Sequence, residues 1–223
     1  NQALKQVLLE ETPWVLAAKS EAEQKRNIAQ LFNLVKMSEN RKKITAQLVE
    51  LQTPNGGFSW FKGGPDDRYI TQYIVTGIGH LKQLGALPKD LPQLLQIVDN
   101  ALPYLDARIK EDYDKRDKKN SAVNYLNYYA VQYHYMRSFF IDKGIPGTYL
   151  PAANHYRKEI VQNWMKGNRM AKGMIALALF RTGDKITAES ILKSLEQTAI
   201  TNEELGMYWK DNSYRYYWQD API

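Results

Sequence analysis

The feature that most restricts how this chain can fold is residues 52–71, where glycine, proline and aromatic residues interrupt two helical patterns. The stretch reads Gln-Thr-Pro-Asn-Gly-Gly-Phe-Ser-Trp-Phe-Lys-Gly-Gly-Pro-Asp-Asp-Arg-Tyr-Ile-Thr. Glycine and proline at this density stop a helix, but the aromatic residues are too apolar for a solvated linker. We therefore expect a structured turn that folds back and buries its rings, Trp60 among them, with a positive φ at Gly56 or Gly57.

Two acidic residues, Asp66 and Asp67, stand where the helix after this turn is expected to begin. A carboxylate there accepts hydrogen bonds from unpaired backbone N–H groups and complements the helix dipole. Paired carboxylates also perform acid–base catalysis in glycosidases. The similar stretch near the end of the chain has Gln219-Asp220 instead of a second acidic pair. We therefore favour helix capping over catalysis for both residues.

Apolar residues elsewhere recur with helical spacing, and no stretch sustains the alternation of a strand. Ser20-Glu21-Ala22-Glu23 has the pattern of a capping box that begins one helix, and a second helix is expected from Asn40. The apolar stripes assigned to these two helices are Ile28, Leu31, Phe32, Leu34 and Val35, and then Ile44, Leu48 and Leu51. A further helical pattern covers residues 1–12.

After the turn, helices are expected from Tyr69 to Leu84 and at about 91–113, 121–142, 151–165, 169–181 and 186–199. The first of them is expected to have an apolar face formed by Ile70, Tyr73, Ile74, Gly77, Ile78, Leu81 and Leu84. On that face, Gly77 is expected to allow close approach of a neighbouring helix. Gly85, Gly144 and Gly183 are expected to close helices, and Pro103 to kink or split one.

The sequence thus predicts an all-α fold. The run from Gly57 to Ile70 has a counterpart from Gly206 to Ile223, which indicates repeated helix-to-helix turns. Stacked helical hairpins of this kind favour an α/α toroid, a partial or complete ring of such hairpins. We interpret residues 1–223 as a single segment of a larger multidomain protein, truncated at both ends.

Composition narrows the range of functions. The chain has 223 residues, a formal net charge of +6 and no cysteine, which excludes thiolate metal sites and a cysteine nucleophile within it. Its basic residues are dispersed, so we expect no nucleic-acid partner. The longest apolar run, Met174–Phe180, is too short for a transmembrane segment. Three isolated histidines offer no metal-binding spacing, so we expect neither metal nor cofactor.

Tyrosines crowd the helical pattern at 121–142, and tryptophan and tyrosine residues crowd the end of the chain. For the helical tyrosines, a buried core with polar tips is the favoured interpretation, and a groove for sugar or peptide is the alternative. The rings near the end of the chain are expected to face helical hairpins that residues 1–223 do not contain. The candidate interaction surface comprises Tyr125, Tyr129, Trp209 and Trp218.

The Gln-x-x-x-Gly-x-aromatic pattern that begins at Gln52 resembles a turn that recurs in α/α-toroid proteins such as terpenoid cyclases and the thioester domains of α2-macroglobulins. The fuller resemblance is to the thioester-domain region of bacterial α2-macroglobulins, and it extends over nearly the whole chain. The matching segments are Leu8–Trp14, Glu23–Arg26, Asn55–Trp60, Asp66–Tyr73, Arg181–Lys185 and Gly206–Trp209.

This resemblance implies a secreted or periplasmic endopeptidase inhibitor that traps proteases, and not an enzyme. In that family, bait cleavage exposes an internal Cys-Gln thioester that acylates the attacking protease. No Cys-x-x-Gln stands in this chain, and in the family it would precede residue 1. The implied partners are other domains of the same polypeptide and, through the full-length protein, target proteases.

For these residues the resemblance implies a structural role in shaping the turn: Gln52, Gly56, Gly57, Phe58, Trp60, Asp66, Asp67 and Tyr69. Two alternatives stay open. One is a carbohydrate-active toroid enzyme that uses Asp66 or Asp67, and the other is a sugar- or peptide-binding module built on the tyrosine clusters.

Overall fold

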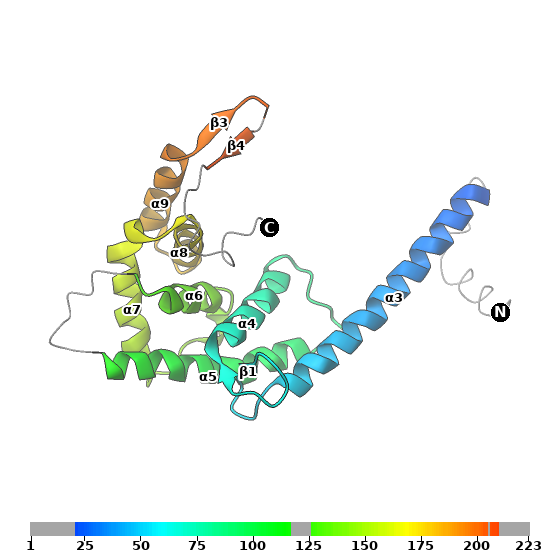
Figure 1. The fold of residues 1–223 in the computed structure, drawn as a ribbon, viewed down its shortest axis with the longest axis horizontal. Coiled ribbons are helices and arrows are strands. Elements are labelled where there is room, and N and C mark those ends of the chain that lie inside the picture. Colours follow the sequence, from blue (N-terminus) through cyan, green and yellow to red (C-terminus); the bar gives the residue numbers. More distant parts are fainter. Residues whose placement is uncertain (1–20, 117–125, 205, 210–223) are drawn as a thin grey trace. The chain divides into compact units, whose positions relative to one another are not determined.

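The computed structural model describes residues 21–116, 126–204 and 206–209. These residues are mostly helical, with seven α-helices labelled α3 to α9 and two small antiparallel sheets of two strands each (Figure 1). The expected helical class is therefore confirmed in its broad form, while the two strand pairs were not expected. The chain divides into two units, residues 1–50 and 51–223, which we describe separately.

In the first unit, helix α3 (Glu21–Leu51) is continuous, so the prediction of two helices with a new start at Asn40 is wrong. Its sequence contains neither glycine nor proline, and nothing in it breaks the helix. The expected burial of its apolar residues is wrong for Phe32, Val35 and Ile44, which are exposed. Ser20 of the capping box and the helical pattern at 1–12 lie outside the described residues.

The second unit contains the other six helices, and five of them have bounds close to those expected. They are α4 (Arg68–Gln83), α5 (Gln93–Lys115), α6 (Tyr128–Arg137), α7 (Leu150–Asn163), α8 (Arg169–Arg181) and α9 (Lys185–Gln197). Short 3₁₀ helices follow α6 and α7, at Ile141–Lys143 and Trp164–Lys166. Strand β1 (Phe58–Ser59) pairs with β2 (Asp66–Asp67), and β3 (Ile200–Asn202) pairs with β4 (Gly206–Tyr208).

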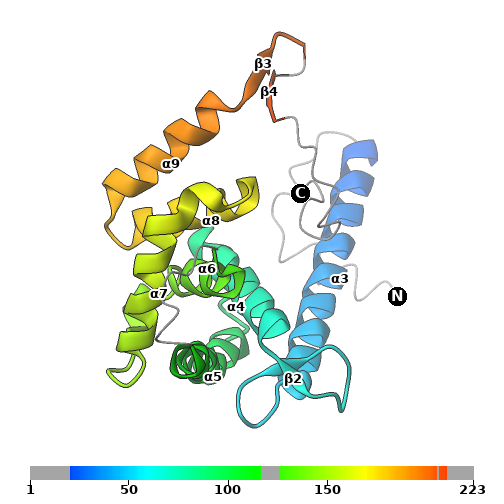
Figure 2. The ribbon, with the colours of Figure 1, turned by 60° about the vertical axis from the view of Figure 1, so that its left-hand side comes forward.

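Helix α6 contacts α4, α5, α7 and α8, and both views show it among them (Figures 1 and 2). Its side chains Tyr133 and Met136 are fully buried. The interpretation of the tyrosine-rich helix as core is thus confirmed at Tyr133, whereas Tyr129 on the same helix is exposed. The helix is shorter than the predicted 121–142, although residues 117–125 are not described.

Helix α4 buries Ile78, as hydropathy predicted, but the rest of its buried face differs from the prediction. The buried residues are Thr71, Gln72, Val75, Ile78 and Gly79. Tyr73 and Leu84, which were assigned to the apolar face, are exposed. Two polar residues lie on the true inner face because their side chains hydrogen-bond neighbouring backbone: Phe58 N donates to Thr71 Oγ1, and Gln72 Nε2 donates to Tyr129 O.

The glycine that permits close helix packing is Gly79, and the prediction for Gly77 is wrong. A Cβ atom at Gly79 would lie 2.6 Å from Cγ of Phe139, whereas one at Gly77 would meet open space. The terminating glycines were predicted correctly, since Gly85, Gly144 and Gly183 all have positive φ. Pro103 does not split its helix, because α5 runs through it unbroken.

Candidate functional site

The turn at residues 52–71 is fastened to α5 through the side chain of Gln52. Gln52 Nε2 donates to the carbonyl of Gly56 at 3.0 Å, within the turn, and to the carbonyl of Ile97 at 2.9 Å, on α5. Asn100, one turn farther along α5, donates from Nδ2 to Gln52 Oε1 at 3.1 Å. A single amide thus fixes where the turn begins and how it meets α5.

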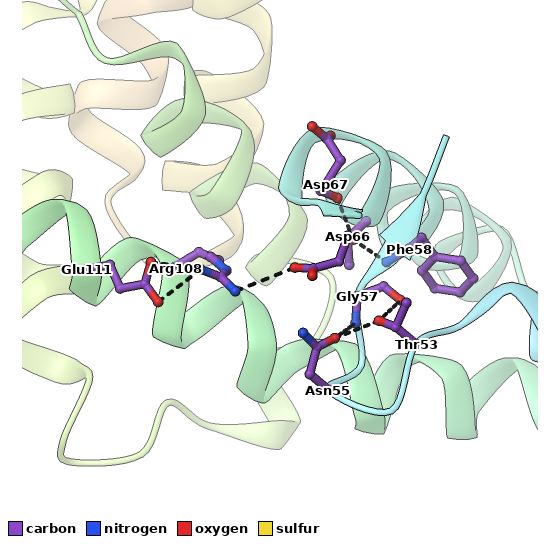
Figure 3. Close-up of polar contacts among 9 residues, drawn as sticks. Thr53, Asn55, Gly57, Phe58, Asp66, Asp67, Arg108 and Glu111 are labelled. Atoms are coloured by element: carbon purple, nitrogen blue, oxygen red, sulfur yellow. Dashed lines mark hydrogen bonds and ion pairs between the residues drawn. The ribbon is translucent and has the colours of Figure 1, made fainter. Parts of the chain in front are cut away.

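The inside of the turn is closed by short-range hydrogen bonds (Figure 3). Thr53 Oγ1 donates to the carbonyl of Gly57 at 2.9 Å, and the Gly57 amide donates to Asn55 Oδ1 at 3.0 Å. Gly56 has φ +91°, which confirms the expected positive φ in the glycine pair. A Cβ atom at Gly56 would lie 2.0 Å from the carbonyl oxygen of Asn100, so only glycine fits against α5 there.

Phe58 and Asp67 join the turn to the start of α4. The Phe58 ring is buried, as expected, and its backbone pairs with Asp67 across the β1–β2 ladder. Asp67 is the N-cap of α4, because its Oδ1 accepts from the amide of Ile70 at 3.0 Å. Thr71 Oγ1 donates to the Asp67 carbonyl at 2.7 Å. The capping role predicted for Asp67 is therefore confirmed.

Asp66 has another role than the predicted capping: its carboxylate turns towards α5 (Figure 3). A hydrogen bond with Tyr104 lowers the pKa of Asp66 below its ordinary value, against the opposing effect of burial. Arg108 Nη2 lies 3.5 Å from Asp66 Oδ2, and the same guanidinium binds Glu111. Burial and this carboxylate together raise the pKa of Tyr104. Asp66 and α5 thus share a polar cluster at the partly exposed edge of the turn.

This cluster bears on acid catalysis. A general acid at neutral pH needs a raised pKa, and that of Asp66 is lowered. The Asp67 carboxylate is engaged in capping. The arrangement therefore gives both carboxylates structural partners.

The prediction that Trp60 is buried is wrong: 61% of its surface is exposed, and Phe61 is exposed as well. Strand β1 ends at Ser59, and both rings belong to the loop beyond it. Trp60 instead stacks on Tyr69, with ring centroids 6.1 Å apart and planes 13° apart. Tyr69 stacks in turn on Tyr73, at 6.5 Å and 21°.

The structure does not bring the expected interaction surface together as one patch. The guanidinium of Arg68 lies over the ring of Tyr129 on α6, 4.0 Å from the ring centroid. Trp209 follows β4 and donates from Nε1 to the carbonyl of Leu195 at 2.8 Å. Tyr125 and Trp218 lie outside the described residues.

Sequence reasoning missed a buried ion pair between Asp106 on α5 and Arg137 on α6, which are 1% and 6% exposed. Arg137 Nη2 donates to Asp106 Oδ2 at 3.3 Å, and the Tyr133 hydroxyl donates to Oδ1 at 2.7 Å. Burial raises the pKa of Asp106, although Arg137 and Tyr133 act against that rise. The signal available in the sequence was an aspartate on the apolar face of α5, between Leu102 and Ile109.

The pair borders a cavity of about 320 Å³, which is open to solvent and also lined by Asp99, Pro103 and Lys143. Lys143 and Asp99 form a second ion pair. The charges that line this cavity therefore balance, two acidic against two basic.

The histidines form no metal centre: no group of three metal-ligating side chains occurs in the part of the chain that the structure describes. Burial, with the nearby charge of Arg157, lowers the pKa of His134 to about 4, so its imidazole is neutral at pH 7. His134 also lines a cavity of about 20 Å³ together with Thr182 and Arg157. Within the described ranges, no helix has the length and apolar character needed to span a membrane.

No known family model matches this chain, and no curated protein matches it.

Proposed function

We propose that this chain is a thioester-domain-like segment of a bacterial α2-macroglobulin-type protein, an endopeptidase inhibitor of the periplasm or cell envelope. In this proposal its helices form part of an α/α toroid, and a longer polypeptide, here called the parent protein, contains it. The observation that carries the proposal is the set of hydrogen bonds that join Gln52 to Gly56, Ile97 and Asn100, which we call the Gln52 clamp. Each residue of the Gln-x-x-x-Gly-x-aromatic pattern has a distinct structural role, since Gln52 binds α5, Gly56 supplies the positive φ, and Phe58 is buried.

The other end of the chain supports a repeated unit. Helix α9 is followed by the β3–β4 pair, in which Gly206 has positive φ. Helix α3 is likewise followed by a bridge between Gln52 and Phe58 around a turn that contains Gly56. Among the described residues, a helix followed by a short antiparallel turn thus occurs twice, which is consistent with a repeated structural unit.

The chain itself is non-catalytic in this account. It has no cysteine, so the sulfur of a thioester must come from elsewhere in the parent protein. The helical segment would shield that acyl donor from water until a protease cleaves the bait. The structural engagement of Asp66 and Asp67 favours this role over a carbohydrate-active enzyme.

The experiment that tests the proposal incubates the parent protein and the 1–223 fragment separately with trypsin. A high-mass adduct that survives denaturant is expected from the parent protein and is expected to be absent from the fragment. The matched control replaces the cysteine of the parent's Cys-x-x-Gln by alanine, which should remove the adduct while bait cleavage continues. Adducts from the fragment, or none from a cysteine-bearing parent that is demonstrably cleaved, would overturn the proposal.

A further inference from the structure

The turn contains the single Asn-Gly pair of the sequence, Asn55 and Gly56. Asparagine deamidates fastest before glycine, because glycine has no side chain to obstruct attack on the asparagine amide and its backbone rotates freely. Asn55 is exposed, whereas Gly56 is buried against α5. The proposed function makes no use of this reactive pair.

Deamidation of Asn55 requires only water and a base such as hydroxide. The backbone nitrogen of Gly56 loses its proton to the base and attacks Cγ of Asn55. The new C–N bond closes a succinimide ring, and the side-chain NH₂ group takes up a proton and leaves as ammonia. Water then opens the ring at one of its two carbonyl groups, which leaves aspartate or isoaspartate at residue 55.

The folded turn holds both reacting groups in other bonds. The Gly56 nitrogen donates to the carbonyl of Thr53 at 2.8 Å, and the Thr53 nitrogen donates to the carbonyl of Gly57 at 2.9 Å. Asn55 Oδ1 accepts from the Gly57 amide at 3.0 Å (Figure 3). Gln52 fixes the carbonyl of Gly56 on the other side of the peptide. The succinimide ring therefore cannot close until this part of the turn opens.

Neither product fits the closed turn. Isoaspartate adds a methylene group to the backbone directly before Gly56, where even a Cβ atom would lie 2.0 Å from the carbonyl oxygen of Asn100. Aspartate keeps the backbone but replaces the side-chain NH₂ group. Tyr104 and, less strongly, Asn55 donate hydrogen bonds that lower the pKa of Asp66. Aspartate at residue 55 would replace one of these donors by a like charge.

From this geometry we infer that Asn55 is a site of spontaneous deamidation, which the closed turn protects and an open turn exposes. Segments of a folded protein open locally at a lower free energy than the whole chain unfolds. Each opening of the turn frees the Gly56 nitrogen to react, and the product then prevents the turn from closing against α5. The pair thus converts a transient opening into a permanent one.

The test incubates the 1–223 chain in mildly alkaline buffer and follows deamidation at residue 55 by peptide mapping and mass spectrometry. A synthetic peptide of residues 52–61 gives the rate without the fold. We expect the folded chain to react more slowly than this peptide by about tenfold or more. Gln52→Ala should accelerate the reaction in the chain by about tenfold, because it removes the Gln52 clamp.

The matched control is Ile191→Ala, which removes a fully buried side chain on α9, away from the turn. It should leave the rate at Asn55 within about twofold of the unaltered chain. Far-ultraviolet circular dichroism verifies that the variants are folded, and the comparison with the peptide decides alone if Gln52→Ala is not.

Two results would overturn the protection: a folded chain that reacts as fast as the peptide, or a folded Gln52→Ala chain that reacts no faster than Ile191→Ala. The effect of the product is measured on deamidated chain purified by ion exchange. We expect it to unfold at a lower urea concentration than the unmodified chain. Equal midpoints would contradict the claim that the product keeps the turn open.

Discussion

The side chains of Gln52 and Asn100, 48 residues apart, are joined by a hydrogen bond of 3.1 Å from Asn100 Nδ2 to Gln52 Oε1. Gln52 Nε2 meanwhile donates to two carbonyl groups, one in the turn and one on α5. The amide therefore acts as donor and acceptor at once, a combination that no other side chain of its length supplies.

Gln52→Glu is the sharpest test of this clamp. It keeps the size of the side chain but directs carboxylate oxygens at the carbonyls of Gly56 and Ile97, which offer no proton. We expect it to lower the free energy of unfolding by about 2 kcal/mol or more, and at least as much as Gln52→Ala. Urea denaturation measures this, with Gln93→Ala on the exposed surface of α5 as the control. A Gln52→Glu protein as stable as the control would contradict the claim that the hydrogen bonds of Gln52 stabilise the fold.

Gly56 and Gly63 form a matched pair that tests whether the turn requires glycine at residue 56 because it lies against α5. Both have positive φ, +91° and +81°, but only at Gly56 does an added Cβ meet the backbone of α5. Gly63→Ala should therefore show backbone strain alone, about 1 kcal/mol, whereas Gly56→Ala should be more destabilising by several-fold. Thermal melts of the two variants measure the difference. Equal destabilisation would mean that the turn does not lie tightly against α5.

The buried pair Asp106–Arg137 is expected to be strongly coupled. Removing one partner leaves the other charge buried alone, so Asp106→Leu or Arg137→Met should each destabilise by about 3–5 kcal/mol. The triple variant that adds Tyr133→Phe removes both charges and the hydroxyl that binds Asp106. We expect it to be more stable than either single variant. Additive losses in chemical denaturation would show that the groups act independently.

The pKa of His134 predicts how stability depends on pH. Its folded value of about 4 lies below the ordinary 6.5, so the unfolded chain binds more protons between these values. Stability should therefore fall as pH decreases from 6.5 towards 4, with a slope from this group of at most about 1.4 kcal/mol per pH unit. His134→Gln should flatten that slope in denaturation curves recorded across the range. An unchanged slope in the variant would assign the effect to other groups.

Local chemistry made part of the turn predictable from the sequence. Glycine density required a positive φ, now seen at Gly56, and an aspartate before a helical pattern predicted the cap at Asp67. The burial expected for Trp60 is wrong because hydropathy does not reveal where a strand ends. The roles of Gln52 and Asp66 depend on α5 side chains more than 35 residues away, which no local pattern specifies.

The packing faces were less predictable for a related reason. Thr71 and Gln72 lie inside because they hydrogen-bond other segments, and Gly79 of α4 lies against Phe139, which follows α6. In α3, the apolar residues predicted a buried stripe, and Phe32 and Ile44 are exposed. Hydrophobic spacing thus indicated the helices well, but it did not identify the partners that their faces meet.

The most direct measurement of the proposed function counts free thiols in the parent protein before and after bait cleavage. When an amine attacks a thioester, an amide forms and the cysteine sulfur leaves as a thiol. Residues 1–223 contain no cysteine, so any new thiol comes from the rest of the polypeptide. The account predicts one additional titratable thiol per molecule after trypsin cleaves the bait. No increase in a parent protein whose bait is demonstrably cleaved would contradict it.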